Sequence, residues 1–348
     1  MKSYKHLYEA LEEDDLIILA IRKAARGKRK RPYVKKIVEH PEDYVDYYRS
    51  YVLCYYSVDR KPKVIYDGIQ KKKRTIYRPT FDEQVMHTMI VEVLKPIIMK
   101  ELYPHVHGSL PGRGAIQNKK QIVKWFKKKK CKYYFKCDIK KFFDSVSTGM
   151  LKIFLWYKIK DCRFLRLLGM VIDCVPTGLP LGFNTSHWLA HWYIASIDWK
   201  IVNKFHPKAY TRYVDDIVIF DNSKRKLHRI KNFLDNLLLH KILILKNNYR
   251  IVKMNNRNFL DFMGFKFYNN RITLRKSIML RITRKSKRLT KKNLNIHSAR
   301  SIASSIGPLK HTNTYNMYKD CIKPFVNFGK IKHYISKFDR RANTCGAA

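Results

Sequence analysis

Two adjacent aspartates inside an apolar stretch constrain this sequence more than any other feature. Residues 209–220 run Ala-Tyr-Thr-Arg-Tyr-Val-Asp-Asp-Ile-Val-Ile-Phe, so β-forming segments flank Asp215 and Asp216 on both sides. The pattern predicts a β-hairpin with the acid pair at or beside its turn. Asp-Asp is unfavourable there, because hairpin turns prefer Asn-Gly or Asp-Gly. Two carboxylates at such a position suit a hard divalent cation, although an isolated pair is more often a solvated turn.

The charge of the chain predicts a large anionic partner. Its 348 residues include 73 Lys and Arg but only 27 Asp and Glu, a formal net charge of +46, while 45% hydrophobic content argues against disorder. The basic residues are spread along the chain, with dense runs at 28–31, 71–74, 127–130 and 284–288. A nucleic acid fits this distribution better than a membrane, because no basic amphipathic helix stands apart from a neutral body. No apolar run approaches the ~20 residues of a membrane span.

The cysteines predict a reduced, cytoplasmic protein. There are seven, an odd number, and no C-x-x-C spacing occurs among them. Disulfide frameworks and zinc ribbons are therefore not expected.

A third acid ends another apolar run. Residues 133–138 predict a buried strand that ends at Asp138, with Phe142 and Phe143 just beyond it. A carboxylate at the end of a buried strand is costly unless it is paired or binds a metal. The two Phe side chains cannot both point inward at a strand–helix corner, and Asp144 is expected to cap a helix.

The remaining segments predict a mixed helical and sheet protein. We expect helices over residues 1 to about 60, 81–98, about 115–130, 186–203 and 227–239, a hairpin over 63–76, a strand pair over 259–267, and a basic helical region from about 275. The tyrosines of 44–56 could stack on bases but are expected mainly to form core.

Two further motifs are weaker. In the loop 109–114, Gly112 and Gly114 are expected to let the backbone approach a ligand, but no G-K-[ST] follows, which excludes a nucleoside triphosphatase loop. His187 and His191 have the spacing of a zinc-protease helix, yet Trp188 replaces the required Glu, so both are expected to be structural.

Taken in chain order, these segments resemble the reverse transcriptases. The resemblance covers most of the chain and rests on the basic strand, the Gly-Arg-Gly loop, the strand ending in Asp138, and the motifs at 178–186, 213–216, 245–246 and 262–265. It implies an α+β, right-hand polymerase fold with fingers, a palm of antiparallel sheet plus helices, and a helical thumb. The expected ranges are a basic N-terminal extension at 1–60, fingers at 61–130, palm with some fingers elements at 131–268, and thumb at 269–348.

Among subgroups, the sequence looks most like the bacterial group of group II intron proteins and diversity-generating retroelements. The segments 24–29 and 178–186 and the chain length favour the retroelement type, although Leu181-Gly182 and Ser186-His187 depart from the Ile-Gly and Ser-Gln usual there. Two alternatives remain: a phage-defence reverse transcriptase of the abortive-infection type, and a non-catalytic RNA-binding protein with the same fold.

The resemblance also implies roles for individual residues. Two Mg²⁺ ions, for which Mn²⁺ can substitute, would be held by Asp138 and Asp215, with the Ile139 carbonyl assisting and Asp216 close by, and Lys246 would act as a general acid. The implied nucleotide-binding residues are Lys73, Arg74, Arg78, Phe143 as the sugar gate, Leu181 and Gly182. The implied primer and template contacts are Arg113, Tyr213, Met263, Gly264, Arg284, Lys285 and Arg288.

The implied partners follow from the same resemblance. They are an RNA template and its cDNA, deoxynucleoside triphosphates, a structured cognate RNA and a small helical accessory protein. No membrane partner is expected.

Overall fold

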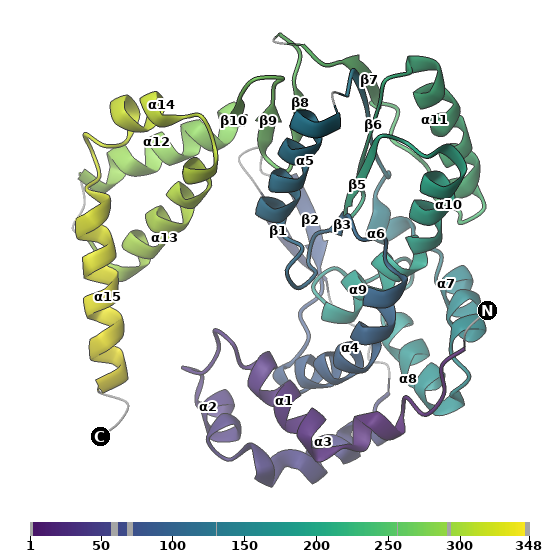
Figure 1. Cartoon of the computed structure of the whole chain (residues 1–348). Helices are drawn as coiled ribbons and strands as arrows, with labels where there is room; N and C mark the ends of the chain where they lie inside the picture. The colour runs from purple at the N-terminus through teal and green to yellow at the C-terminus, as the bar shows by residue number, and fades with distance from the viewer. Residues whose placement is uncertain are drawn as a thin grey trace. The chain divides into compact units, whose positions relative to one another are not determined.

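The computed structural model describes residues 3–56, 62–67, 72–129, 131–255, 257–290 and 294–344 (Figure 1). Lys71 and Lys130 of the basic runs, and Lys291 and Lys292 of the basic region from about 275, lie outside these residues. The chain forms two compact units, one of Met1–Gly114 and Phe135–Ile251, the other of Ala115–Tyr134 and Val252–Ala348. Helices accompany β-sheet in both, which confirms the α+β class. The four predicted lobe ranges remain predictions.

The first unit begins with helices, as predicted. They are η1 (Glu9–Glu12), α1 (Asp14–Ala24), α2 (Pro32–Glu39), η2 (Pro41–Tyr44) and α3 (Val45–Leu53), and α1 packs along α4 (Phe81–Glu101). A capping box between Thr80 and Glu83 fixes the start of α4. In the tyrosine cluster, Tyr48 is buried as core, whereas Tyr56 is exposed.

A two-stranded hairpin precedes α4, as the sequence indicates. Strand β1 (Lys63–Asp67) pairs antiparallel with β2 (Lys72–Ile76), and Ile65 lies opposite Arg74.

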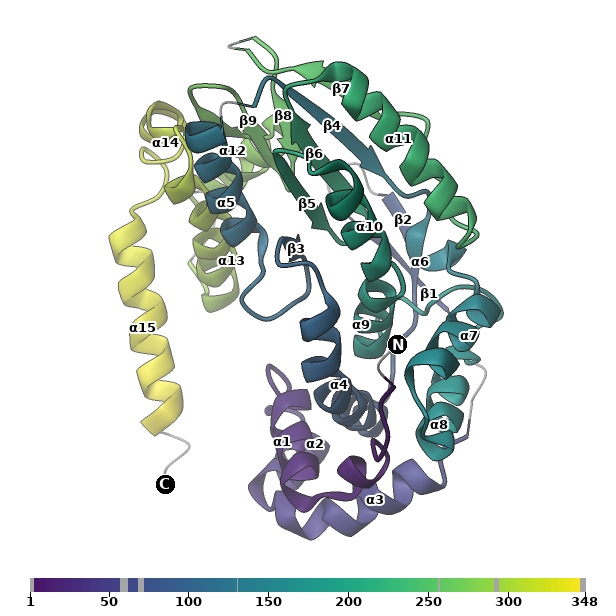
Figure 2. The ribbon, with the colours of Figure 1, turned by 45° about the vertical axis from the view of Figure 1, so that its right-hand side comes forward.

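A five-stranded mixed sheet has the order β3-β5-β6-β4-β7. Its strands are β3 (Val106–His107), β5 (Ala209–Tyr213), β6 (Asp216–Asp221), β4 (Tyr133–Asp138) and β7 (Arg250–Lys253). Strands β5 and β6 form the predicted antiparallel hairpin, and β3 pairs parallel with β5. Helix α11 (Lys224–Leu239) packs against β6 and against α10 (Ala195–Phe205) (Figure 2). Its buried residues are Leu227, Ile230, Leu234 and Leu238.

The other helices of this unit correct two expectations. They are α6 (Phe142–Ser145), α7 (Thr148–Lys158), α8 (Cys162–Ile172) and α9 (Asn184–Tyr193). The helix expected over 186–203 is broken at Ile194, where the Ile197 N–H donates to the Ile194 carbonyl and tightens the turn. Asp144 does not cap a helix: it lies inside α6, because the chain turns sharply at Lys141 (φ 44°), which occupies the N-cap position.

The second unit contains a small antiparallel sheet and most of the C-terminal helices. Its sheet has the order β10-β9-β8, with β8 (Leu260–Phe262), β9 (Phe265–Phe267) and β10 (Ile272–Leu274). Its helices are α5 (Ala115–Lys129), α12 (Lys276–Thr290), α13 (Ile296–Ile306), η3 (Gly307–His311), α14 (Tyr315–Cys321) and α15 (Phe328–Thr344). Helix α13 packs against both α12 and α15.

No helix in the described part of the chain is long and apolar enough to cross a membrane.

Candidate functional site

The turn of the β5–β6 hairpin consists of Val214 and Asp215. Tyr213 pairs with Asp216, so Asp216 is the first residue of β6, and the predicted placement of the acids at the turn is confirmed. Val214 has φ 57°, a left-handed conformation that β-branched residues strongly disfavour. The unfavourable residues at this turn are therefore accompanied by backbone strain at Val214.

Strand β4 brings the third acid to the hairpin. The Ile139 N–H, one residue beyond Asp138, donates to the Asp215 carbonyl at 3.3 Å. The Lys246 N–H donates to the Asp138 carbonyl at 2.8 Å, and the Lys246 ammonium forms an ion pair with Asp138 Oδ2. Three segments far apart in sequence thus place the predicted acids and Lys246 in one cluster.

Burial perturbs both hairpin carboxyls. Burial is the largest cause, and together with the hydrogen-bonded, negatively charged side chain of Asp138 it raises the pKa of Asp215 to about 7. Burial likewise raises the pKa of Asp216 to about 6, although Lys136, whose Nζ is 3.4 Å from Asp216 Oδ1, opposes the shift. Burial and the neighbouring acids thus favour the protonated, uncharged forms of both carboxyls.

The donor set fits a divalent cation. Asp138 Oδ1 and Asp216 Oδ1 are buried and accept no hydrogen bond from any described residue. Carboxylate oxygens of this kind are the ligands that Mg²⁺ prefers. Within the described ranges, no three His, Cys, Asp or Glu side chains are grouped as a ready-made metal site. Any cation would thus need ligands in addition to these side chains.

Phe143 is held at the edge of this region. Phe142 is buried and Phe143 only partly so, as expected for the pair. The Leu179 N–H donates to the Phe143 carbonyl at 2.8 Å, and the His187 ring lies edge-on to Phe143 at 5.1 Å. A Cβ on Gly178 would approach the Phe143 carbonyl oxygen to 2.4 Å, so glycine permits this contact.

The loop 178–186 also meets the end of β2. The Tyr77 N–H donates to the Leu181 carbonyl at 2.7 Å, and a Cβ on Gly182 would lie 2.2 Å from the Tyr77 oxygen. The predicted nucleotide-binding pair Leu181-Gly182 is thereby anchored beside the basic strand. On that segment the side chains of Lys73, Arg74 and Arg78 are exposed.

No protein atom crowds Gly112 or Gly114, since a Cβ at either position would meet nothing within 4 Å. Their expected role in letting the backbone approach a ligand stays a prediction. Their neighbour Arg113 donates to the Tyr103 carbonyl at 3.2 Å.

A basic cavity of about 790 Å³ lies beside the Gly182 loop. It is lined by the end of α1, the segment before α2, the segment after β2 and the start of α9. The cations in this lining are Lys23, Arg26, Lys28, Arg31 and Arg78. Lys28 is fixed by donating to the Ala24 carbonyl and to Gln84. A cavity of this charge suits phosphate groups.

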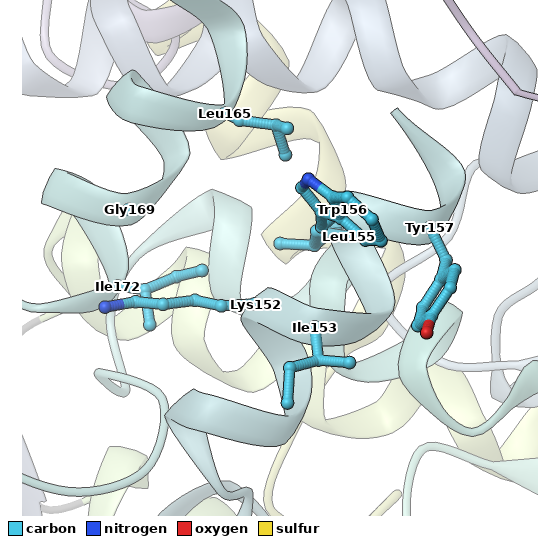
Figure 3. Close-up of a pocket in the computed structure, with 8 residues that line it drawn as sticks. All are labelled: Lys152, Ile153, Leu155, Trp156, Tyr157, Leu165, Gly169 and Ile172. Atoms are coloured by element: carbon cyan, nitrogen blue, oxygen red, sulfur yellow. The ribbon is translucent and has the colours of Figure 1, made fainter. Parts of the chain in front are cut away.

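A second cavity has different chemistry. It is about 620 Å³ in volume and lies between α7 and α8, where Ile153, Trp156 and Tyr157 are half exposed (Figure 3). Its lining contains no carboxylate, and its one cation, Lys152, pairs with Asp173. This apolar surface is distinct from the acidic cluster.

In the second unit, Met263 and Gly264 form the β8–β9 turn with φ of 52° and 83°. Arg275 braces it by donating its backbone N–H to the Gly264 carbonyl at 2.9 Å and its side chain to Asp261.

On α12, the side chains predicted to contact phosphates differ in whether they face solvent or bond within the protein. Arg284 and Arg288 are exposed on one face. Lys285 instead donates to the Ser301 carbonyl and to Ser305 Oγ.

Sequence analysis missed several residues around the hairpin. Lys136 is an ion-pair partner of Asp216, and Arg212 and Asp198 form a fully buried ion pair next to the turn. A charged residue at position 212, inside an otherwise apolar strand, is the signal that could have revealed this pair. His191, expected to be structural, is buried against Arg212.

Comparison with known proteins identifies the family. The model of the family described as "Reverse transcriptase (RNA-dependent DNA polymerase)" matches residues 61–267, more than half of the chain, and the chain belongs to this family.

The chain also resembles individual proteins. The chain is 28% identical over 174 residues to the Retron Ec73 reverse transcriptase of Escherichia coli, covering 45% of this chain and 52% of that protein. The chain therefore spans about half the length of this curated relative. The apo telomerase of Candida tropicalis superimposes with a TM-score of 0.51 at 13% identity, covering 72% of this chain and 52% of that one, which shows a shared fold.

We predict that Asp215→Asn stabilises the metal-free protein. The folded-state pKa of Asp215 is about 7, above the ordinary value of 3.8, so the ionised side chain destabilises the fold at pH 8. This penalty decreases progressively as the pH falls from about 7 towards 3.8. In EDTA at pH 8, urea denaturation should show a gain of about 1–2 kcal/mol. The gain should shrink by pH 5.

The exposed Asp144 provides the control, since Asp144→Asn should change stability little at either pH. Equal effects of the two variants at pH 8 would contradict the inferred desolvation of Asp215.

Proposed function

We propose that this protein is an RNA-directed DNA polymerase that copies an RNA template into cDNA. The observation that carries the proposal is the cluster in which Asp138 meets Asp215 and Asp216, with buried carboxylate oxygens lacking hydrogen bonds. Phosphoryl transfer requires positioning and neutralisation of charge more than covalent participation by the protein. The acids of this cluster suit that requirement.

Two Mg²⁺ ions would be bound by Asp138 and Asp215, with the Ile139 carbonyl and Asp216 contributing. When bound, the ions would supply charge neutralisation for the triphosphate and activation of the primer 3′-hydroxyl. Mn²⁺ would be able to substitute, because it also accepts oxygen ligands.

Two lysines would balance the acids. Lys246 pairs with Asp138 and Lys136 lies beside Asp216. With the carboxylates engaged by cations, the Lys246 ammonium would be released to protonate the pyrophosphate leaving group, as a general acid does. Lys136 would remain next to Asp216 and limit the repulsion between the acids.

The exposed cations of the β2 segment would bind the incoming nucleotide. Lys73, Arg74 and Arg78 would hold its triphosphate, and Leu181-Gly182 would contact its base pair through the backbone. Phe143 would pack under the sugar and exclude a 2′-hydroxyl. Its anchoring by the Gly178 loop and His187 supports this role, because a sugar gate must be rigid.

Basic surfaces in each unit would hold the nucleic acid. The cavity with Arg26, Lys28 and Arg31 would take phosphates of the RNA template. Within the second unit, Arg284 and Arg288 would contact the duplex backbone, and the braced Met263-Gly264 turn would support the primer end. Arg113 and Tyr213 would contact the primer or template, and Lys285 would act by fixing α12 to α13.

The biological setting has two candidates. The sequence motifs favour a diversity-generating retroelement, with a structured cognate RNA and a small helical accessory protein. The curated relative is instead a retron reverse transcriptase, and this relation favours a bacterial defence enzyme. cDNA synthesis without a supplied primer would distinguish the defence type, whereas Mg²⁺-independent function would indicate the non-catalytic alternative.

Primer extension on an RNA template tests the activity directly. Wild-type protein with Mg²⁺ and deoxynucleotides should extend a DNA primer, and Asp215→Ala should lose at least about 100-fold because a metal ligand supplies several kcal/mol of transition-state stabilisation. Asp173→Ala, which removes an exposed acid paired with Lys152, is the matched control. An Asp215→Ala rate within tenfold of wild type would refute the assignment.

We also predict that Phe143→Ala increases ribonucleotide incorporation relative to deoxynucleotide incorporation by tenfold or more, because the space for a 2′-hydroxyl opens. The ratio of kcat/KM for the two nucleotides is the measurement. Phe154→Ala, a partly buried aromatic residue that contacts Trp192, should leave this ratio unchanged. An unchanged ratio in Phe143→Ala would remove the sugar-gate assignment.

A further inference from the structure

We propose that the buried Asp198–Arg212 pair, acting with His191, is a positioning device that holds the strained Val214 turn and so places Asp215. This inference rests on the proposed function, since it concerns the presentation of a metal-binding carboxylate. It assigns a role to residues that do not themselves touch the reacting atoms.

The pair is rigidly built. Arg212 and Asp198 are both fully buried, and the guanidinium donates to the carboxylate from Nε at 2.8 Å and from Nη2 at 2.7 Å. The Tyr210 hydroxyl also donates to Asp198. A planar guanidinium held in this bidentate way has one orientation, and its remaining nitrogen, Nη1, must point in a fixed direction.

That direction is the hairpin turn. Arg212 Nη1 donates to the Val214 carbonyl at 2.8 Å and lies 3.1 Å from His191 Nδ1. The other ring nitrogen of His191, Nε2, lies 2.8 Å from the Gly108 carbonyl oxygen. These contacts define the neutral tautomer that accepts at Nδ1 and donates at Nε2, and burial lowers the pKa of His191 to about 3, so it stays neutral.

The other side of the turn is held as well. The Val214 N–H donates to the His107 carbonyl at 3.0 Å, and a Cβ on Gly108 would lie 2.6 Å from Val214 Cγ2. Val214 is therefore fixed at its N–H, its carbonyl and its side chain. Because a β-branched residue leaves φ 57° when it is free to do so, these contacts oppose a relaxation that would rotate the next peptide, which carries Asp215.

A buried ion pair that merely stabilises the core would show the same distances. In a positioning role, the effect of Arg212 on the site depends on the strain at Val214. In a purely stabilising role, it does not. Glycine adopts positive φ without strain, so Val214→Gly should keep the turn in place with less help from Arg212. A double-mutant cycle between these positions therefore separates positioning from general stabilisation.

The test uses Arg212→Lys, which keeps the charge but cannot reproduce the bidentate fork. With Val214 present, kcat for primer extension should fall at least tenfold while KM for the deoxynucleotide stays within about threefold. In the Val214→Gly background the same substitution should lower kcat by threefold or less. Equal factors in both backgrounds, or an unchanged kcat with Val214 present, would overturn the proposal.

A second readout keeps the result independent of the polymerase assignment. Mn²⁺ affinity, measured by electron paramagnetic resonance on the same four proteins, should weaken severalfold in Arg212→Lys and recover in the Val214→Gly background. If wild type bound Mn²⁺ but made no cDNA, the proposed function would fail while this cycle still decided the positioning role. Equal Mn²⁺ affinity in wild type and Arg212→Lys would contradict it.

Two further variants test whether misfolding or reduced stability explains the loss of kcat. If circular dichroism shows that Arg212→Lys does not fold, His191→Leu replaces it in the test. His191→Leu removes the second contact of Arg212 Nη1 without removing a buried charge. It should lower kcat when Val214 is present and lower it much less in the Val214→Gly background. Lys158→Met breaks the ion pair with Glu101 and should lower the melting temperature without changing kcat in either background. A loss of kcat in Lys158→Met equal to that in Arg212→Lys would show that reduced stability alone explains the effect.

Discussion

The site depends on one unfavourable piece of backbone geometry. The β5–β6 hairpin has a two-residue turn, and a short turn of this kind requires positive φ at its first position. Here that position is Val214 rather than glycine, so the conformation persists only because the surroundings hold it. A looser turn would relieve the strain but would not fix Asp215 beside Asp138. The same tight turn therefore fixes Asp215 beside Asp138 and strains the backbone at Val214.

The second constraint on the site is the electrostatic repulsion between its buried acids. Buried carboxylates raise one another's pKa, as for Asp215 beside Asp138, and either protonation or a nearby cation relieves the repulsion. Lys246 and Lys136 supply part of that charge from the protein itself. Acidic groups are scarce in a chain with net charge +46, so their concentration here contrasts with the basic surfaces proposed to hold nucleic acid. The divalent cations that we propose for this site would offset the destabilisation caused by the buried acids.

Local patterns predicted most of the elements, because periodicity and turn residues act over short distances. The hairpin at Asp215 and Asp216, the strand ending at Asp138 and the helices α4, α5 and α11 follow from such patterns. Patterns did not reveal the break at Ile194 or the placement of Asp144 inside α6, since both depend on how the chain turns in three dimensions.

The same limit applies to the site. The acids could be predicted, since each interrupts an apolar run. Their supporting residues could not, because Asp198 and Arg212 are joined only through tertiary contacts. Gly108 illustrates this: it did not stand out in the sequence, yet a Cβ there would lie 2.6 Å from Val214 Cγ2.

The central claim is that carboxylates far apart in sequence share a pair of divalent ions. Electron paramagnetic resonance of Mn²⁺ bound to the protein with an RNA template, a DNA primer and a non-hydrolysable deoxynucleotide tests it most directly. The account predicts two magnetically coupled Mn²⁺ ions in wild type and loss of the coupled pair in both Asp138→Asn and Asp215→Asn. A coupled pair that persists in either variant, or its absence from wild type, would contradict it.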